Sequence, residues 1–466
     1  MKAFSGGYFI RSVGAQVQSE KVQDWPRILV GDLEIGTSEN TLFSYSIDSK
    51  SGCFVVIIGT AIDVVSGSID QRSIVSNILR LVSPTDLDAA LKNIAYLAGR
   101  FIAVIGNATR TRIVPDCHAT LASFWTEKQK KVVVASHSYL TALLVGAELD
   151  KVSLEIQNSS DYVEPGGKYY PGILTPYENI RPIIANCFLE IDSTGHVLGH
   201  TRFYPWRDIV EKSSLDVTFS DFAIQLNEVA RLHAALGPSS VSLTAGLDSR
   251  TLLKSLAPNL LPGSKSYTYV RFEDGWSHYA EDLIGASRYS SDLSVPHQII
   301  RLEKFNPSDT WNSEYVKTFP KGSRFPALAK CYEKNFERKD ISILGTGAET
   351  GTVFYEEREV RRISPQRLAD KFTLSKIGKS QLLFDVFEEY IDYTQFNDEQ
   401  IGSIDYHDLF YWEHRNSKWA NLWYSELDLS HRSFVPFNSR ALIEVMLTLP
   451  FELRKSKYLL NRFLAT

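Results

Sequence analysis

The sequence predicts two domains of different fold class, joined near residue 210. In the first half, short β-branched runs are bounded by Gly, Asn, Asp or Ser and do not alternate strictly with helical segments, which is typical of packed antiparallel sheets with helices outside. In the second half, strand-like runs are separated by helical patterns, which predicts a doubly wound parallel sheet. We therefore expect a sandwich-type α+β domain over residues 1–210 and an α/β domain over residues 211–466.

The composition is that of an ordinary globular protein, long enough for two or three domains. The 466 residues are 44% hydrophobic and 23% charged, and a net charge of −5 offers no basic footprint for nucleic acid. No apolar run approaches the ~20 residues that span a bilayer, so no membrane partner is expected. Four cysteines stand far apart without metal-site spacing, which favours a reducing, cytoplasmic compartment: Cys53, Cys117, Cys187 and Cys331.

The first half is predicted to contain several short strands and two helices. The strands are rich in Val, Ile and Phe, and the helices carry apolar residues at helical spacing. The expected strands cover residues 54–60, 101–105, 111–114 and 131–136, and the expected helices cover residues 74–81 and 86–97. A polar linker, Glu211-Lys-Ser-Ser214, then marks the change to the second domain.

The second half alternates strands with helices. Strands are expected at residues 241–243, 266–270, 299–302 and 341–344, with helices over 222–236 and 281–293. Ligands bind at the carboxyl ends of the strands in such sheets. Because the loops 244–249 and 345–351 both begin where predicted strands end, we expect them to converge on one ligand.

The loop 244–249, Thr-Ala-Gly-Leu-Asp-Ser, carries the clearest chemical signal. A strand, a small-residue turn and a helix start bring several backbone N–H groups to one point, which suits a phosphate or pyrophosphate. The hydroxyls of Thr244 and Ser249 add donors, and Asp248 can hold the magnesium of a nucleotide. No Gly-Lys-Ser/Thr follows, so the loop is not of the Walker type. The alternative is a plain helix cap, in which Asp248 and Ser249 bond the first N–H groups.

This loop resembles the Ser-Gly-Gly-x-Asp-Ser loop of the ATP-pyrophosphatase superfamily, and the segments after it resemble the synthetase domain of the asparagine synthetase family. Glu281-Asp-Leu-Ile-Gly-Ala286 keeps the spacing of the family's Asp-Glu-x-x-x-Ala, with the two acids exchanged. Leu344-Gly-Thr-Gly-Ala-Glu-Thr350 corresponds to its Ser-Gly-Glu-Gly-Ser-Asp-Glu loop. Two later segments match its Val-Pro-Phe and Lys-x-x-Leu-x-Arg motifs, namely Phe434-Val-Pro-Phe-Asn-Ser-Arg440 and Ser456-Lys-Tyr-Leu-Leu-Asn-Arg462.

The resemblance implies a ligase that uses ATP and Mg²⁺ to adenylate a carboxylate, releases pyrophosphate, and lets an amine attack to form an amide. Thr346, which stands where the family usually has Glu, and Lys457 occupy its catalytic positions, and Asp248 and Glu349 its metal positions. Lys457 would stabilise the developing charge, with a solvated helix lysine as the alternative. The predicted ATP and pyrophosphate site consists of Leu243, Thr244, Ala245, Gly246, Asp248, Ser249, Val270, Gly345 and Gly347.

The first half resembles the glutaminase-type domain that precedes the synthetase domain in asparagine synthetase. Its matching stretches follow the order of the family and begin at Leu97, Val114, Ser136, Tyr177 and Thr201. The nucleophile of that domain is a cysteine at the mature amino terminus. Here position 2 is Lys2, the first cysteine is Cys53 and the nearest hydroxyl is Ser5. We therefore expect a scaffold that has lost glutamine hydrolysis, as in the β-lactam synthetases and lasso-peptide cyclases of the same family.

Several residues outside the loops keep two interpretations. Arg250, Arg271 and the cluster Arg358, Arg361 and Arg362 could bind an acidic substrate, although surface charge is favoured for the cluster. Cys117-His118 is interpreted as structural, because neighbours on a strand point to opposite faces and cannot share a proton. The aromatic stretch 409–415, with Trp419 and Trp423, is expected in the core rather than in a pocket.

The sequence leaves the substrates open. The predicted partners are a small-molecule or peptide carboxylate and an amine, asparagine formation from aspartate and ammonia being one case, and the chain is a candidate homodimer. The alternative class is a non-catalytic scaffold or binding protein with a degenerate nucleotide site, which the substitutions at Thr346 and Glu349 would allow.

Overall fold

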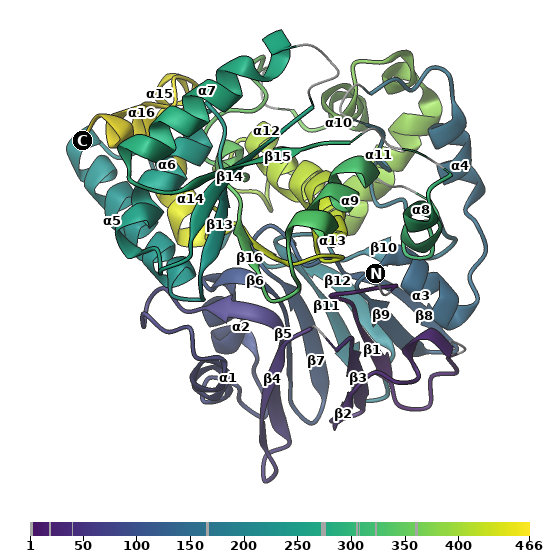
Figure 1. Cartoon of the computed structure of the whole chain (residues 1–466). Helices are drawn as coiled ribbons and strands as arrows, with labels where there is room; N and C mark the ends of the chain where they lie inside the picture. The colour runs from purple at the N-terminus through teal and green to yellow at the C-terminus, as the bar shows by residue number, and fades with distance from the viewer. Residues whose placement is uncertain are drawn as a thin grey trace.

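The described residues form three β-sheets, two in the lower half of Figure 1 and one in the upper half. The computed structural model describes residues 3–17, 20–39, 41–164, 167–271, 276–303, 306, 308–321, 324–358 and 362–466, so Lys2 and Arg361 lie outside the described residues. The two sheets of the first half are antiparallel and the sheet of the second half is parallel. The predicted succession of antiparallel and then parallel sheets is therefore confirmed.

The first half forms two antiparallel sheets of six strands each. The order in one sheet is β10 (Arg181–Pro182), β8 (Phe124–Lys128), β9 (Lys131–Ala135), β1 (Tyr8–Ser12), β3 (Leu33–Thr37) and β2 (Arg27–Val30). The order in the other is β12 (Val197–Arg202), β11 (Cys187–Asp192), β7 (Arg110–Pro115), β6 (Ala98–Gly106), β5 (Cys53–Ile62) and β4 (Phe43–Asp48).

The two sheets pack against each other through apolar side chains that alternate along their strands. Ile10 and Val134 from one sheet share a buried cluster with Val56 from the other. Val55, the next residue along β5, faces outward and packs with the helices α1 (Gln71–Leu79) and α2 (Asp88–Ala95). On the outer face of the first sheet, α3 (Ser138–Val145) packs in the same way, and α4 (Lys151–Asn158) follows it. The short 3₁₀ turn η1 (Glu20–Val22) lies before β2.

The second half is built on a five-stranded parallel sheet with the order β15 (His297–Arg301), β14 (Lys265–Val270), β13 (Ser239–Ser242), β16 (Ile341–Ile343) and β17 (Arg432–Phe434). Every adjacent pair is parallel. The chain runs outward from β13 to β15 and then returns to the other side of β13. The strand order thus reverses between β13 and β16, which is the place where ligands bind in open α/β sheets.

Helices cover both faces of this sheet. Ser266 on β14 bonds Ser290 of α7 (Trp276–Asp292), whereas its neighbour Tyr267 packs on Tyr332 of α9 (Pro326–Asn335). Because successive strand residues point to opposite faces, α7 and α9 lie on opposite sides. The other helices of this half that pack with the sheet are α5 (Leu215–Ala234), α6 (Leu247–Leu256), α13 (Asn421–Leu427), α14 (Arg440–Leu447) and α16 (Tyr458–Ala465).

A second helical cluster lies beside the parallel sheet. It contains α10 (Pro365–Phe372), α11 (Gln381–Thr394), α12 (Tyr406–Phe410) and the π-helix η6 (Tyr411–Ala420), which leads without a break into α13. The aromatic stretch at 409–415 is buried there, as predicted, with Phe410 and Trp412 fully enclosed. The remaining short elements are α8 (Thr310–Tyr315), α15 (Phe451–Lys455), η2 (Ala257–Asn259), η4 (Ala348–Thr350) and η5 (Lys376–Lys379).

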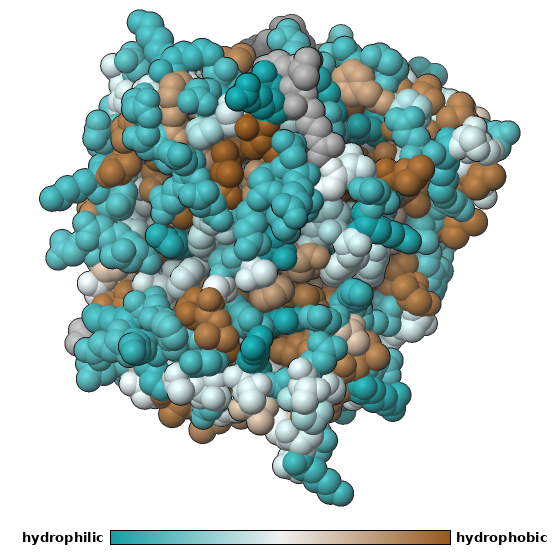
Figure 2. All heavy atoms as spheres, turned by 180° about the vertical axis from the view of Figure 1, so that it is seen from behind, coloured by the Kyte–Doolittle hydropathy of each residue, from teal (hydrophilic) through white to brown (hydrophobic). Residues whose placement is uncertain are grey.

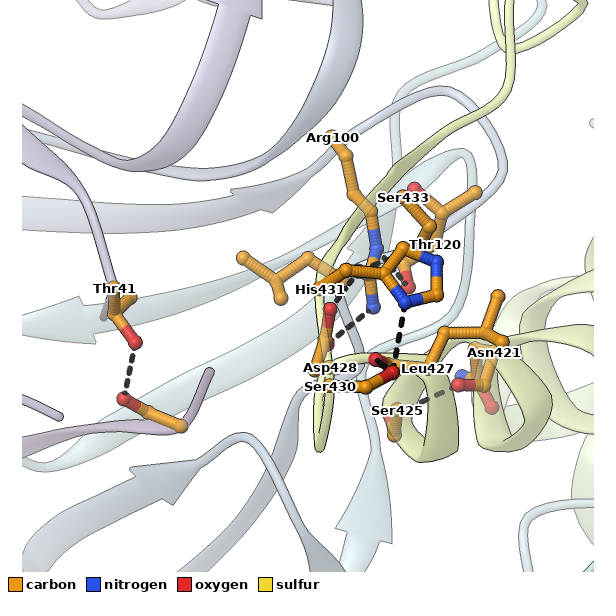
Figure 3. Close-up of polar contacts among 12 residues, drawn as sticks. Thr41, Arg100, Thr120, Asn421, Ser425, Leu427, Asp428, Ser430, His431 and Ser433 are labelled. Atoms are coloured by element: carbon orange, nitrogen blue, oxygen red, sulfur yellow. Dashed lines mark hydrogen bonds and ion pairs between the residues drawn. The ribbon is translucent and has the colours of Figure 1, made fainter. Parts of the chain in front are cut away.

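Buried polar contacts join the two halves. Arg100 on β6 makes a bidentate ion pair with Asp428, at 2.5 and 2.8 Å, and also donates to Ser433 (Figure 3). Arg202 on β12 pairs with Glu413 of η6 at 2.6 Å, and both side chains are almost completely enclosed. The halves therefore have a specific, desolvated interface, while the boundary at residue 210 stays a prediction within the segment between β12 and α5.

The element predictions erred at their edges and at short strands. α5 begins at Leu215 rather than at residue 222, because Ser214 is not linker but the cap that accepts from the N–H of Val217. The sequence does not predict β17, because a strand of three residues is too short to give a periodicity signal. None of the described helices is long and apolar enough to cross a membrane. From behind, hydrophilic side chains cover most of the surface and hydrophobic ones form small groups between them (Figure 2).

Candidate functional site

Two loops meet at the carboxyl edge of the parallel sheet. β13 runs into the loop before α6, and β16 runs into the loop before η4. The backbone of Gly345 lies so close to that of Ser249 that a Cβ on the glycine would be 2.8 Å from the Ser249 Cα. The two predicted loops are thus in contact, and a side chain at position 345 would push them apart.

The first loop is held by its own hydroxyl groups. The N–H of Thr244 donates to the Ser249 Oγ at 3.1 Å, and the N–H of Gly246 donates to the Thr244 Oγ1 at 3.1 Å. Gly246 is the N-cap of α6 and makes no side-chain capping bond. The alternative of a plain cap through Asp248 and Ser249 is therefore wrong. The hydroxyls predicted to meet the pyrophosphate instead brace the loop, so binding through them would add to these bonds or replace them.

Asp248 has one carboxylate oxygen with a partner and one without. Its Oδ1 is buried and has no hydrogen-bond partner among the described residues, whereas its Oδ2 lies 3.5 Å from the Lys457 Nζ. Burial raises the pKa of Asp248, and the charge of Lys457 opposes that rise. A buried carboxylate oxygen without a donor is costly unless a cation or a ligand satisfies it.

Glu349 lies close enough to Asp248 for the Asp248 charge to disfavour the ionised form of Glu349. Burial raises the pKa of Glu349, and the Asp248 charge raises it further. Its Oε2 accepts from the N–H of Gly347 at 3.1 Å. Two acids facing one lysine leave a net negative charge, so the oxygen-only donor set fits a hard divalent cation such as Mg²⁺. Among the described residues, no group of three or more His, Cys, Asp or Glu side chains is arranged to hold a metal, so substrate phosphates and water would have to complete the coordination.

Lys457 reaches this pair from the far end of the chain. It is the N-cap of α16 and has a left-handed backbone with φ of 53°. Its side chain is 34% exposed and points at Asp248 rather than only into solvent. The interpretation as an ordinary solvated helix lysine is therefore disfavoured, while its catalytic role stays a prediction.

Thr346 is brought to the same edge but is already engaged. Its Oγ1 lies 2.7 Å from the hydroxyl of Tyr424 on α13. Leu243 directly follows β13, and Val270 ends the neighbouring β14. Their backbones are tied into the sheet, with the Leu243 N–H donating to the Tyr267 carbonyl and the Val270 carbonyl accepting from the Leu302 N–H. The structure thus gathers the predicted loop residues, although it leaves their contacts with a nucleotide untested.

Three residues of this region were not predicted as part of the site. Asp282 on α7 accepts from the N–H of Ala245 at 2.9 Å and so holds the first loop. His118, from the first half, lies 3.0 Å by its Nε2 from the Thr350 Oγ1 and braces the second loop. Tyr424 is the partner of Thr346. Of these, only Asp282 had a sequence signal, because it lies in the acidic motif at 281–286.

The other predicted candidates make contacts of their own within the protein. Arg358 is neither surface charge nor a free substrate contact, because it pairs with Asp408 at 2.5 Å and with Asp405 at 3.1 Å. Arg250 donates to the carbonyl of Gly246 and lies over the ring of Tyr289. Ser5 is buried and accepts a hydrogen bond from Arg338.

Cys117 and His118 are structural, as predicted, but for a different reason. They lie in the turn after β7 and not on a strand. Burial raises the pKa of the Cys117 thiol to about 12 and lowers that of His118 to about 3. The thiol therefore stays protonated and the imidazole neutral, which is unsuitable for a thiolate nucleophile.

Comparisons with known proteins leave the family open. No protein-family model and no curated protein matches the sequence. Among solved structures, glutamine phosphoribosylpyrophosphate amidotransferase from B. subtilis complexed with ADP and GMP aligns at 12% identity and a TM-score of 0.25, over 74% of this chain and 71% of its own. A structure described as the allosteric regulatory enzyme of purine biosynthesis aligns at 12% identity and 0.27, over 75% and 72%. Scores this low carry no argument, so the fold assignment rests on the strand order itself.

Proposed function

We propose that the protein is an ATP-dependent amide-forming ligase that adenylates a carboxylate and transfers the acyl group to an amine. The observation that carries this proposal is the Asp248 Oδ1, a buried carboxylate oxygen without a donor, beside Glu349 and Lys457 at the switch point of a parallel sheet. That combination favours a phosphate-bearing ligand with its metal ion over a purely structural ion pair.

The reaction follows from what these groups can hold. A substrate carboxylate attacks the α-phosphate of ATP, pyrophosphate leaves, and an amine attacks the resulting acyl-adenylate with release of AMP. Mg²⁺, held by Asp248 and Glu349, would neutralise phosphate charge. Lys457 offers a positive charge to the leaving pyrophosphate, where negative charge builds up in the transition state. The backbone of the loop 244–249 positions the phosphates, with Asp282 fixing its first turn.

The first half serves as a buttress in this proposal and not as a glutaminase. All four cysteines are buried, and burial raises the thiol pKa of Cys117 and Cys187 to about 12. Ammonia or another amine would therefore reach the acyl-adenylate without glutamine hydrolysis by these residues. His118 contributes structurally by bracing the second loop.

An ATP–pyrophosphate exchange assay tests the proposal. Labelled pyrophosphate should enter ATP in the presence of Mg²⁺ and a panel of carboxylates that includes aspartate, aromatic acids and sugar acids. The Asp248→Asn variant should lose exchange, whereas Asp161→Asn, at an exposed position of the first half, should keep it. Absence of both exchange and ATP binding would establish the alternative, a scaffold with a degenerate nucleotide site. Glutamate release from glutamine well above background would instead reveal a missed nucleophile.

A further inference from the structure

A cavity lies at the carboxyl ends of β14 and β15, on the same edge of the parallel sheet as the candidate site. It has a volume of about 460 Å³ and is lined by Tyr269, Arg271, Leu302, Arg324, residues 325–328, Trp419 and Trp423. Volumes of roughly 300–1,000 Å³ are usual for small-molecule sites. The described lining residues include two arginines and no acidic side chain.

The cavity is separate from the predicted nucleotide position at Val270. Along β14, Tyr267 and Tyr269 both contact Tyr332 of α9, so these alternate residues face the α9 side of the sheet. Val270 points to the opposite side, because successive strand residues alternate. The cavity and the proposed reaction centre share helix α13, because Trp423 lines the cavity and the next residue, Tyr424, contacts Thr346.

The walls of the cavity are aromatic and carry unused donors. Phe325 packs edge-on against Trp419 and Trp423, with ring centroids 6.0 and 6.3 Å apart. The indole Nε1 atoms of both tryptophans are buried and have no hydrogen-bond partner among the described residues, and the Trp423 side chain as a whole is nine-tenths buried. A buried N–H group without an acceptor is costly, which indicates that a ligand supplies one.

The two arginines in the cavity wall favour a negatively charged ligand. The Arg324 guanidinium carbon lies 4.4 Å from the ring centroid of Trp419, and its Nη1 donates to the backbone carbonyl of Gly167. Burial lowers the pKa of Arg324 to about 10, because the charged form is poorly solvated, and the charge of the nearby Glu426 offsets only part of this effect. An anion in the cavity would offset that cost and accept from the indole N–H groups.

We propose that this cavity binds the acid that the protein activates, and that this acid carries a flat aromatic or heteroaromatic ring. The ring would pack among Phe325, Trp419 and Trp423, and its anionic group would be held by Arg271 and Arg324 together with the indole donors. This substrate class rests on the proposed function. Trp423 belongs to the hydrophobic core and Trp419 packs against it, as expected, and both side chains also line the cavity.

Calorimetric binding tests the inference without catalysis. Phenylacetate and indole-3-acetate are titrated into the full chain, with and without Mg²⁺ and α,β-methylene-ATP, against aspartate and phenethylamine as probes that lack the ring or the negative charge. We expect at least one aromatic acid to bind about ten-fold more tightly than aspartate, and phenethylamine not to bind. Failure of both aromatic acids in both conditions overturns the inference, as does equal binding of aspartate.

Variants then place the binding in this cavity. Trp423→Phe keeps the ring and removes the N–H, and Arg271→Gln removes a charge, so each should weaken the aromatic acid about ten-fold. Trp125→Phe is the matched control, because it also removes an indole N–H but lies on β8. The affinity of the Trp125→Phe variant for the aromatic acid should equal that of the unmodified chain. Equal affinity in all three variants overturns the inference, and loss of the ATP analogue instead of the acid in Trp423→Phe would make this the adenine site, which also overturns it.

The outcome is separable from that of the proposed function. If aromatic acids bind in the cavity but none supports pyrophosphate exchange, the cavity assignment stands and the ligase proposal fails. If exchange occurs only with acids that do not bind there, the ligase proposal stands and the cavity assignment fails. Should a variant fail to fold, judged by its melting temperature, the comparison of probes on the unmodified chain decides alone.

Discussion

Two aspartates, the buried Asp116 in the first half and the partly buried Asp248 in the second, show how differently the halves use charge. Asp116, after β7, is 1% exposed and accepts from the backbone N–H groups of Thr120 and Leu121 and from the side chain of Asn438. Asp248 has one oxygen without any partner among the described residues. Burial raises the pKa of both. A carboxylate enclosed by donors fixes a turn, whereas one left with an open oxygen is available to a ligand.

The largest effect should follow from Asp248→Asn. The amide keeps the shape but cannot balance a cation, so pyrophosphate exchange should fall by about 100-fold or more, in the range seen when one electrostatic contact to a transition state is removed. The folded state should persist by circular dichroism. Exchange within a few-fold of the unmodified chain would show that the open oxygen has no catalytic use.

Asp116→Ala should reduce stability rather than activity. It leaves several buried donors without an acceptor, so the free energy of unfolding should fall by about 3 kcal/mol in denaturant titrations. Exchange per folded molecule should change little. A stable Asp116→Ala variant with lost exchange would reverse the roles that we assign to the two aspartates.

Lys457→Gln should reduce exchange by roughly 10- to 100-fold, because the leaving pyrophosphate loses its nearby cation. Lys457→Arg keeps the charge and is the matched control, which should recover part of the loss. Stability should change by less than about 1 kcal/mol, since the Lys457 side chain is partly exposed. Equal activity of the Gln and Arg variants would remove charge as the explanation.

The pH dependence of stability should reveal the raised pKa values of Asp248 and Glu349. Because the folded-state pKa values of Asp248 and Glu349 are raised, the folded state binds more protons than the unfolded state above their ordinary values of 3.8 and 4.5. Stability is therefore lost as the pH rises from those values through the folded-state pKa values. Asp248→Asn should be more stable than the unmodified chain at pH 7, by on the order of 1 kcal/mol, and the gain should vanish below pH ~4. Melting curves across pH check this, and a gain that grows on acidification would contradict it.

The smallest effect is expected from Tyr424→Phe. Loss of the hydroxyl that contacts Thr346 should lower exchange only a few-fold, in line with about 1 kcal/mol for a neutral hydrogen bond. Thr346→Val removes the other partner of this hydrogen bond and should lower exchange by a similar factor. If Thr346→Val alone abolishes exchange, the threonine has a role in the reaction beyond its bond to Tyr424.

The sequence predicted the sheets better than the contacts around the site. β5, β6 and β13 are β-branched or bounded by turn residues, which makes them recognisable as strands. The helical patterns between the strands of the second half predict that its sheet is parallel. The convergence of residues 244–249 with 345–351 also follows, because parallel strands end at one edge. The contacts of Tyr424 and His118 with the second loop could not be predicted, since they join segments 78 and 232 residues apart in the chain.

The cavity was missed for a related reason. Trp419 and Trp423 look like core residues in an aromatic stretch, and only the tertiary placement of Arg271 and Phe325 opposite them makes a pocket wall. Burial alone does not separate a core tryptophan from one that awaits a ligand. The absence of an acceptor for its N–H does so, and that information resides in three-dimensional structure.

The enclosed pair Arg202–Glu413 has a thermodynamic consequence for the whole chain. Unfolding either half alone would break this pair and expose the apolar surface packed around it to water, so the contact is lost whichever half unfolds first. Unfolding of one half therefore destabilises the other half, and we expect the two halves to unfold together in a single transition. A chain with two architectures thus behaves as one cooperative unit.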